Sequence, residues 1–191
     1  MANPSAERYK FIAHSLNADG PFRPSVTRDS DGFPVSSGTS YLVRYPRESL
    51  EKFASRNDVA WYASPLSQAC NRFVGYLSTK APQRELPQEL YSLMANDIDG
   101  RGNAIDVFWL QFAVNAKARG SMLLLVDMPP SLPANQAIQV ATRAAPYWTS
   151  INPESVTDYS IGEDGKFDFV EFAGTWSDGP VQVDCIWRFT R

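Results

Sequence analysis

The spacing of apolar residues predicts helices over most of the first two-thirds of the chain. Residues 50–61 and 66–77 repeat apolar side chains every three or four positions, as one face of a helix does. Pro65 suits the first position of the second helix with Ser64 as its N-cap; one helix kinked at Pro65 is the alternative. Gly120 is expected to end a helix as its C-cap. Further helices are predicted at residues 7–16, 88–94, 104–118 and 134–143.

The last forty residues change from a period of 3.6 to a period of 2, which predicts strands. Residues 162–165, Gly-Glu-Asp-Gly, separate two alternating segments and are typical of a hairpin turn. The strands are predicted at 156–161, 166–172 and 181–190, and shorter ones at 41–45, 121–126 and 147–151. The segment 121–126 is apolar enough to be a buried strand. The fold class is therefore α+β, with a helical first two-thirds followed by an antiparallel β-meander.

Two regions are expected along the chain. Residues 1–45 are predicted to be a helix followed by an extended arm, because residues 17–40 are rich in Gly, Pro, Ser and Asp. An arm of this kind often becomes ordered only against a partner, here a neighbouring subunit. Residues 46–191 are expected to form one α+β domain. Its parts are helices over 46–119, mixed structure over 120–155 and the β-meander over 156–191.

Composition excludes several classes of protein. The 191 residues are 43% hydrophobic and 20% charged, as in ordinary globular proteins. A net charge of −3 disfavours a protein that coats nucleic acid. The two cysteines, Cys70 and Cys185, are far apart and form no CxxC, which disfavours a zinc knuckle or a disulfide framework. The longest apolar run, 122–126, is far below the roughly 20 residues that span a bilayer, so an intracellular protein without a membrane partner is expected.

The segment that begins at Asp97 invites comparison with a calcium-binding loop. Asp97, Asp99 and Gly102 match three positions of an EF-hand. Arg101 and Phe108 occupy positions at which the EF-hand needs oxygen ligands, so cation binding is disfavoured and a rigid turn between helices is expected.

Four other ionisable residues are candidates for catalytic groups. Asp127 follows an apolar strand, as in nucleotide hydrolases, but the chain has no GxxxxGK[ST] loop, so Asp127 is expected to bond nearby backbone. His14, the only histidine, is expected to be a solvated surface residue beside the arm. Glu163 and Asp164 fall in the hairpin turn and are expected to be exposed. No catalytic residue, cofactor or metal site is therefore predicted.

Aromatic and arginine side chains are the remaining candidates, here for protein interfaces, in which Trp, Tyr and Arg concentrate. The large rings are Trp61, Tyr62, Trp109, Tyr147, Trp148, Trp176 and Trp187. The arginines of the helical part are Arg56, Arg72, Arg101, Arg119 and Arg143. Most of the rings are expected in the core, and the spacing of the arginines does not distinguish phosphate contacts from ion pairs or solvation.

Four segments, in this order, resemble the N-terminal half of the portal-type proteins of tailed bacteriophages, in a branch often described as uncharacterised phage proteins. They are residues 41–49 (YLVRYPRES), 97–102 (DIDGRG), Arg119-Gly120 leading into 124–129 (LLVDMP), and Arg143 with Ala145-Pro146-Tyr147 and 152–156 (NPESV). The resemblance covers roughly residues 41–173. Each motif is weak alone, and the four in register are fairly specific.

The resemblance implies a structural role without catalysis. Portal proteins form a ring, usually a dodecamer, at one capsid vertex; the terminase motor packages DNA through it, and the tail docks onto it. This chain would correspond to the outer wing, in the virion and, during assembly, in the host cytoplasm. Portal proteins continue into a stem, clip and channel, whereas this sequence stops at Arg191, so the DNA contacts of the family cannot be assigned to it.

Two alternatives remain open from the sequence. The first is a monomeric phage accessory or adaptor protein with a wing-like fold. The second is a metal-dependent hydrolase that uses Asp97 and Asp99. A chain that stays monomeric favours the first, and metal-dependent turnover lost in Asp99→Ala favours the second.

Overall fold

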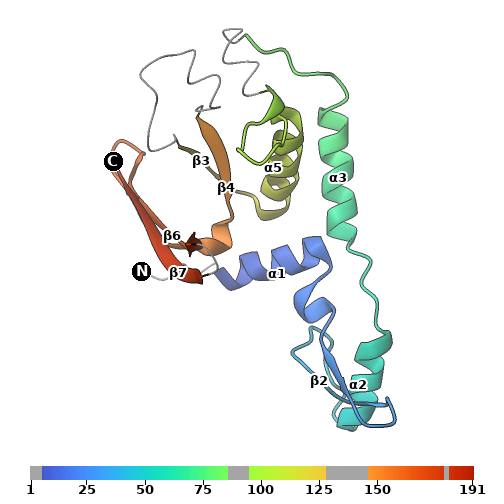
Figure 1. Ribbon diagram of the computed structural model, residues 1–191. Helices are drawn as coiled ribbons and strands as arrows, with labels where there is room; N and C mark the ends of the chain where they lie inside the picture. Colours follow the sequence, from blue (N-terminus) through green and yellow to red (C-terminus); the bar gives the residue numbers. More distant parts are fainter. Residues whose placement is uncertain (1–5, 86–94, 128–145, 179–180) are drawn as a thin grey trace. The chain divides into compact units, whose positions relative to one another are not determined.

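The computed structural model describes residues 6–85, 95–127, 146–178 and 181–191 (Figure 1). The helices predicted at 88–94 and 134–143 lie outside these residues. The described chain forms two compact units. The small unit is residues 10–72, and the large unit is residues 6–9 with the described part of 73–191. The expected boundary at residue 45 falls inside the small unit, because the segment before it packs on the helix after it.

The small unit contains most of α1 (Ala6–Asn17), a 3-10 turn η1 (Gly20–Phe22), the hairpin β1 (Val26–Arg28) and β2 (Pro34–Ser37), and α2 (Leu50–Val59). The hairpin is antiparallel and lies against α2. The side chain of the buried Asn57, on α2, donates to Ser37 Oγ at 3.0 Å and accepts from Ser40 Oγ at 2.8 Å. The prediction of an extended arm is therefore wrong for residues 26–37.

The strand predicted at 41–45 is also wrong, because side chains satisfy the backbone there in place of a neighbouring strand. Arg56 Nη2 donates to Val43 O at 2.8 Å, and Tyr45 N donates to Glu48 Oε2 at 3.1 Å. Arg56 also pairs with both carboxylate oxygens of Glu48, at 3.0 and 2.8 Å. This hydrogen bond from Arg56, opposed by partial burial and assisted by Tyr45 N–H, lowers the pKa of Glu48.

The helix α3 (Pro65–Leu77) begins where the sequence predicts, and the kinked continuous helix is wrong. Ser64 Oγ accepts from Ser67 N at 3.2 Å, the N-cap bond, and donates to Ser15 O at 2.6 Å. Four rings pack around this point, with Phe22 stacked on Tyr62 at 3.9 Å. The other two rings of the cluster are Phe11 and Tyr41. Packing of aromatic side chains and hydrogen bonds of polar side chains therefore stabilise the small unit.

The helix of the large unit is α5 (Ile105–Arg119), and it ends as predicted. Gly120 adopts the left-handed conformation at φ 82°, and its N–H donates to Ala116 O at 2.8 Å. The buried core of this unit is Ile98, Ile105 and Phe108, against which Phe112 and Trp148 pack. The core thus joins the helix to the turn before it and to a strand about forty residues later.

Two antiparallel sheets complete the large unit. In the first, β3 (Leu123–Asp127) pairs with β4 (Tyr147–Ile151). In the second, a short turn η2 (Pro153–Ser155) leads into the meander β5 (Val156–Ile161), β6 (Phe167–Asp178) and β7 (Val181–Thr190). These strands confirm the α+β class. The expectation of a buried strand at 121–126 is corrected, since alternate side chains of β3 are exposed, Val126 by 56%.

Candidate functional site

The turn with the two candidate aspartates is closed by its own hydrogen bonds. Asp97 Oδ1 accepts from Gly102 N at 2.8 Å, and Asp99 Oδ1 accepts from Arg101 N at 3.0 Å. Asp99 Oδ2 accepts from Asn103 Nδ2 at 2.7 Å. Burial disfavours the charge on Asp99, but the bonds from Asn103 and the backbone outweigh it and lower the pKa of this carboxyl.

These bonds give both carboxylates a structural role. Within the described residues no three His, Cys, Asp or Glu side chains lie close enough together to hold a metal ion. The turn directs Ile98, which is fully buried, into the core, and Ile98 O accepts from Trp148 N at 2.8 Å. The hydrogen bonds therefore fit the expected rigid turn.

Asp127 lies at the end of β3, directly opposite Tyr147 on β4. The hydroxyl of Tyr147 donates to Asp127 Oδ2 at 3.1 Å, so Asp127 bonds a side chain across the strand pair. Burial of the Tyr147 ring, with the neighbouring carboxylate, raises the pKa of Tyr147. The pair stabilises the end of a two-stranded sheet.

His14 lies at the surface with its side chain 34% exposed, and neighbouring residues enclose the rest of the ring. Its Nδ1 lies 2.8 Å from Asp19 Oδ1, and Gly20 passes so close that a Cβ there would fall 2.3 Å from the ring. Gly20 also has φ +55°, so glycine suits this turn both because the backbone is left-handed and because there is no space for a Cβ. Glu163 and Asp164 are exposed in the β5–β6 turn as predicted.

One of the candidate arginines forms a buried ion pair that sequence reasoning missed. Arg119, at the end of α5, donates from Nε to Glu154 Oε2 at 3.0 Å and from Nη2 to Glu154 Oε1 at 2.8 Å. The Arg119 side chain is 3% exposed, and Asn115 Oδ1 accepts from its third nitrogen. Arg72 and Arg101 are exposed, and Arg143 lies outside the described residues. Nothing in the spacing of Arg119 and Glu154 could have revealed the pair.

The candidate aromatic residues divide between the core and the surface. Trp148 packs in the core of the large unit and Tyr62 in the ring cluster of the small unit. Trp61 is 78% exposed, and Trp109 and Trp187 are about half exposed. The side chain of Trp176 is not among those that the structure describes. Most of these rings were expected in the core, and three of them are at the surface instead.

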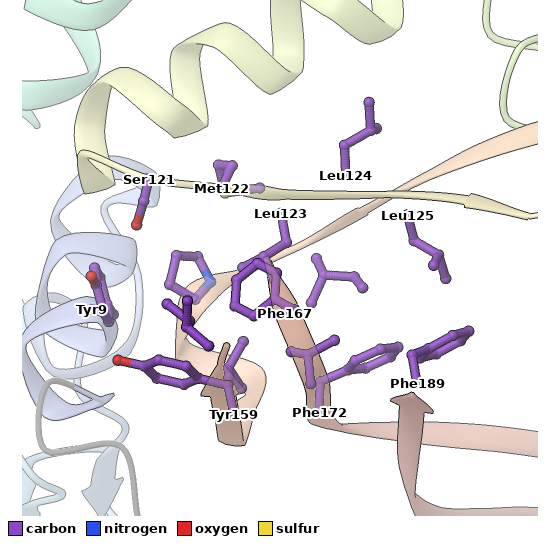
Figure 2. A pocket seen from close by; sticks show the side chains of 15 residues that line it. Tyr9, Ser121, Met122, Leu123, Leu124, Leu125, Tyr159, Phe167, Phe172 and Phe189 are labelled. Carbon is purple, nitrogen blue, oxygen red and sulfur yellow. The ribbon is translucent and has the colours of Figure 1, made fainter. Parts of the chain in front are cut away.

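The large unit contains an apolar cavity of about 630 Å³ that could bind a ligand (Figure 2). β3 and the residues before it form one wall, and the meander forms another. The lining residues are Tyr9, Ser121, Met122, Leu123, Leu124, Leu125, Ile151, Pro153, Val156, Tyr159, Ile161, Phe167, Val170, Phe172 and Phe189. Among the residues that the structure describes, no charged side chain lines it.

The alternation of the meander explains the cavity. Val170, Phe172 and Phe189 lie on one face of the sheet, with the two phenylalanine rings parallel and 5.6 Å apart. The opposite face holds Arg188, which pairs with Glu171 at 3.3 Å. The sequence shows this apolar face as a period of 2. It does not show which strand the face meets, because β3 precedes the meander by some thirty residues.

No family model matches the chain, and a search of curated proteins finds no significant match. In the part of the chain that the structure describes, no helix is long and apolar enough to cross a membrane. Three of the four segments that resemble portal proteins meet in the large unit. Ile98 bonds Trp148, which lies within the fourth segment between Tyr147 and residues 152–156, and Arg119 bonds Glu154.

Proposed function

We propose that this protein is a structural subunit of a phage virion, the wing portion of a portal ring, which works by binding protein rather than by catalysis. The proposal joins the four-segment resemblance to one structural observation: both units expose large apolar side chains. Such surfaces on a folded protein mark sites of protein interaction. The partners proposed are further copies of the chain, capsid protein, terminase and tail protein.

Two groups of exposed apolar residues, one on each unit, are the candidate assembly surfaces. On the small unit, the α2 surface comprises Val59 and the nearby Trp61, 80% and 78% exposed. On the large unit, the β7 surface is centred on Ile186, 65% exposed, on the face of the meander opposite the cavity, whereas Val183 and Trp187 lie on the other face. A ring built head to tail joins two different patches of each subunit, so two distinct apolar surfaces are what its interface requires.

The experiment measures self-association over a range of concentrations by light scattering after gel filtration, with electron microscopy of the largest species. Concentration-dependent oligomers are expected, and rings among them. Trp61→Ser and Ile186→Ser should each weaken association about tenfold or more, since buried aromatic and aliphatic anchors dominate interfaces. Glu163→Gln, an equally exposed change in the β5–β6 turn, is the control and should leave association unchanged.

Two results would contradict the proposal. A wild-type chain that remains monomeric at its highest soluble concentration supports the monomeric accessory protein instead. Metal-dependent hydrolysis that disappears in Asp99→Ala would establish an enzyme. Oligomers unaffected by either surface substitution would keep the assembly role and reject these two surfaces as the interface.

A further inference from the structure

The apolar cavity of the large unit has no part in the proposed assembly surfaces, and its volume falls in the range of small-molecule sites. Ligand sites occupy about 300–1,000 Å³ and combine apolar walls with a few polar groups. From the cavity we infer that this protein binds a neutral amphiphile: an aliphatic body with one uncharged, hydrogen-bonding head.

The walls determine the body of the ligand. Leu123, Leu125, Ile151 and Val170 offer only carbon to the cavity, and none of the described lining side chains is charged. A cavity of roughly 150 Å³ holds one benzene, so 630 Å³ with an open side accommodates up to about twenty non-hydrogen atoms. Lining side chains such as Ile161 and Phe167 are about half exposed, and a bound aliphatic chain would remove them from water.

Three hydroxyl groups determine the head. Tyr9, Ser121 and Tyr159 line the cavity, and Figure 2 shows their oxygens at one end of it, away from Leu125 and Phe189. Among the residues that the structure describes, none of these three hydroxyls has a hydrogen-bond partner. They can donate to or accept from an alcohol or ester. They offer no positive charge to a carboxylate or phosphate.

The test uses 1-decanol as the probe and the intact chain with labelled methyl groups. Addition of 1-decanol should shift the NMR signals of Leu123, Leu125 and Val170 saturably, with a micromolar dissociation constant. Decanoate, which has the same chain with a charged head, should bind at least about tenfold more weakly. Its carboxylate would lose its hydration on binding, and no cationic side chain would compensate for that free-energy cost. Equal or tighter binding of decanoate would overturn the assignment of the head.

Matched variants separate binding in the cavity from binding elsewhere. Val170→Trp fills the cavity and should abolish the shifts, whereas Thr190→Trp adds similar bulk at an exposed position on the opposite face of the meander and should leave them intact. Tyr159→Phe should weaken 1-decanol binding about three- to tenfold, the loss of one hydrogen bond, without changing the spectrum of the free protein.

Three results overturn the inference. They are the absence of saturable shifts, binding that survives Val170→Trp, and an unchanged affinity in Tyr159→Phe. Protection of the same methyl groups only when the chain self-associates would show that a second copy covers the cavity, which would also overturn it. Measured at a concentration at which the chain is monomeric, binding of the probe does not depend on assembly, so its failure is distinguishable from failure of the proposed function.

Discussion

Asp99 shows how one side chain organises a turn through its charge. Its two oxygens accept hydrogen bonds from Arg101 N, Asn103 N and Asn103 Nδ2. Bonds to a charged acceptor are worth more than bonds to a neutral one. The carboxylate therefore remains ionised although partial burial opposes its charge, and its pKa is lowered. The turn in turn holds Ile98 in the core.

This electrostatic role predicts a particular pH dependence. A lowered folded-state pKa contributes stability that is present above the unfolded value of about 3.9 and is lost as the pH falls through the folded-state pKa. Asp99→Asn cannot titrate, so its stability should be lower than wild type by about 1 kcal/mol at pH 6. The difference should shrink as the pH falls to 3. Thermal unfolding followed by near-ultraviolet circular dichroism measures both values.

Glu163→Gln is the control, because this exposed carboxylate lies in the β5–β6 turn, away from the core. It should differ little from wild type at pH 6. If the difference between wild type and Asp99→Asn grew toward pH 3, the stabilising form of Asp99 would be the protonated one, and the charged-acceptor account would be wrong.

At the scale of elements, the ion pair of Arg119 and Glu154 joins the end of α5 to the η2 turn. Both side chains are largely buried, at 3% and 17% exposure, and the pair is bidentate. Removing one partner leaves the other charge buried without compensation, which costs about 3 kcal/mol. Glu154→Ala should therefore lower the free energy of opening of the α5 amides by about this amount in hydrogen exchange.

Two further variants test whether charge is the cause. Glu163→Ala removes an exposed carboxylate and should change the same opening free energies by less than about 0.5 kcal/mol. The double variant Arg119→Met, Glu154→Leu replaces the pair by apolar groups and should recover most of the loss. A double variant as unstable as Glu154→Ala would indicate that packing geometry, and not an unpaired charge, determines the cost.

The elements that the sequence predicted well are those with local signals. Ser64 and Pro65 begin α3 and Gly120 ends α5, because caps act within a few residues. The sequence does not predict the hairpin of β1 and β2, because the hairpin is stabilised by a residue that is distant in the sequence. Its polar strands depend on Asn57, which lies 20 residues beyond its partner Ser37. The wall that β3 gives the cavity was missed for the same reason, since strand pairing and packing leave no local pattern.

At the scale of the whole chain, each unit is stabilised by its own buried polar interactions. In the small unit, Asn57 links α2 to Ser37 and Ser40. In the large unit, Arg119 and Glu154 link α5 to the turn before the meander. Because these contacts join residues of the same unit, each unit should unfold as a cooperative whole of its own. The two units should therefore lose protection from hydrogen exchange independently.

Asn57→Ala tests this independence in the intact chain. The change leaves Ser37 and Ser40 without their buried partner and should lower protection of α2 and of the hairpin about tenfold or more. Protection of α5 and of β3 and β4 should stay at the wild-type level. Glu154→Ala should give the reciprocal pattern. If either variant lowered protection equally throughout the described chain, the two units would open as one, and a surface substitution in one unit would also disturb binding by the other.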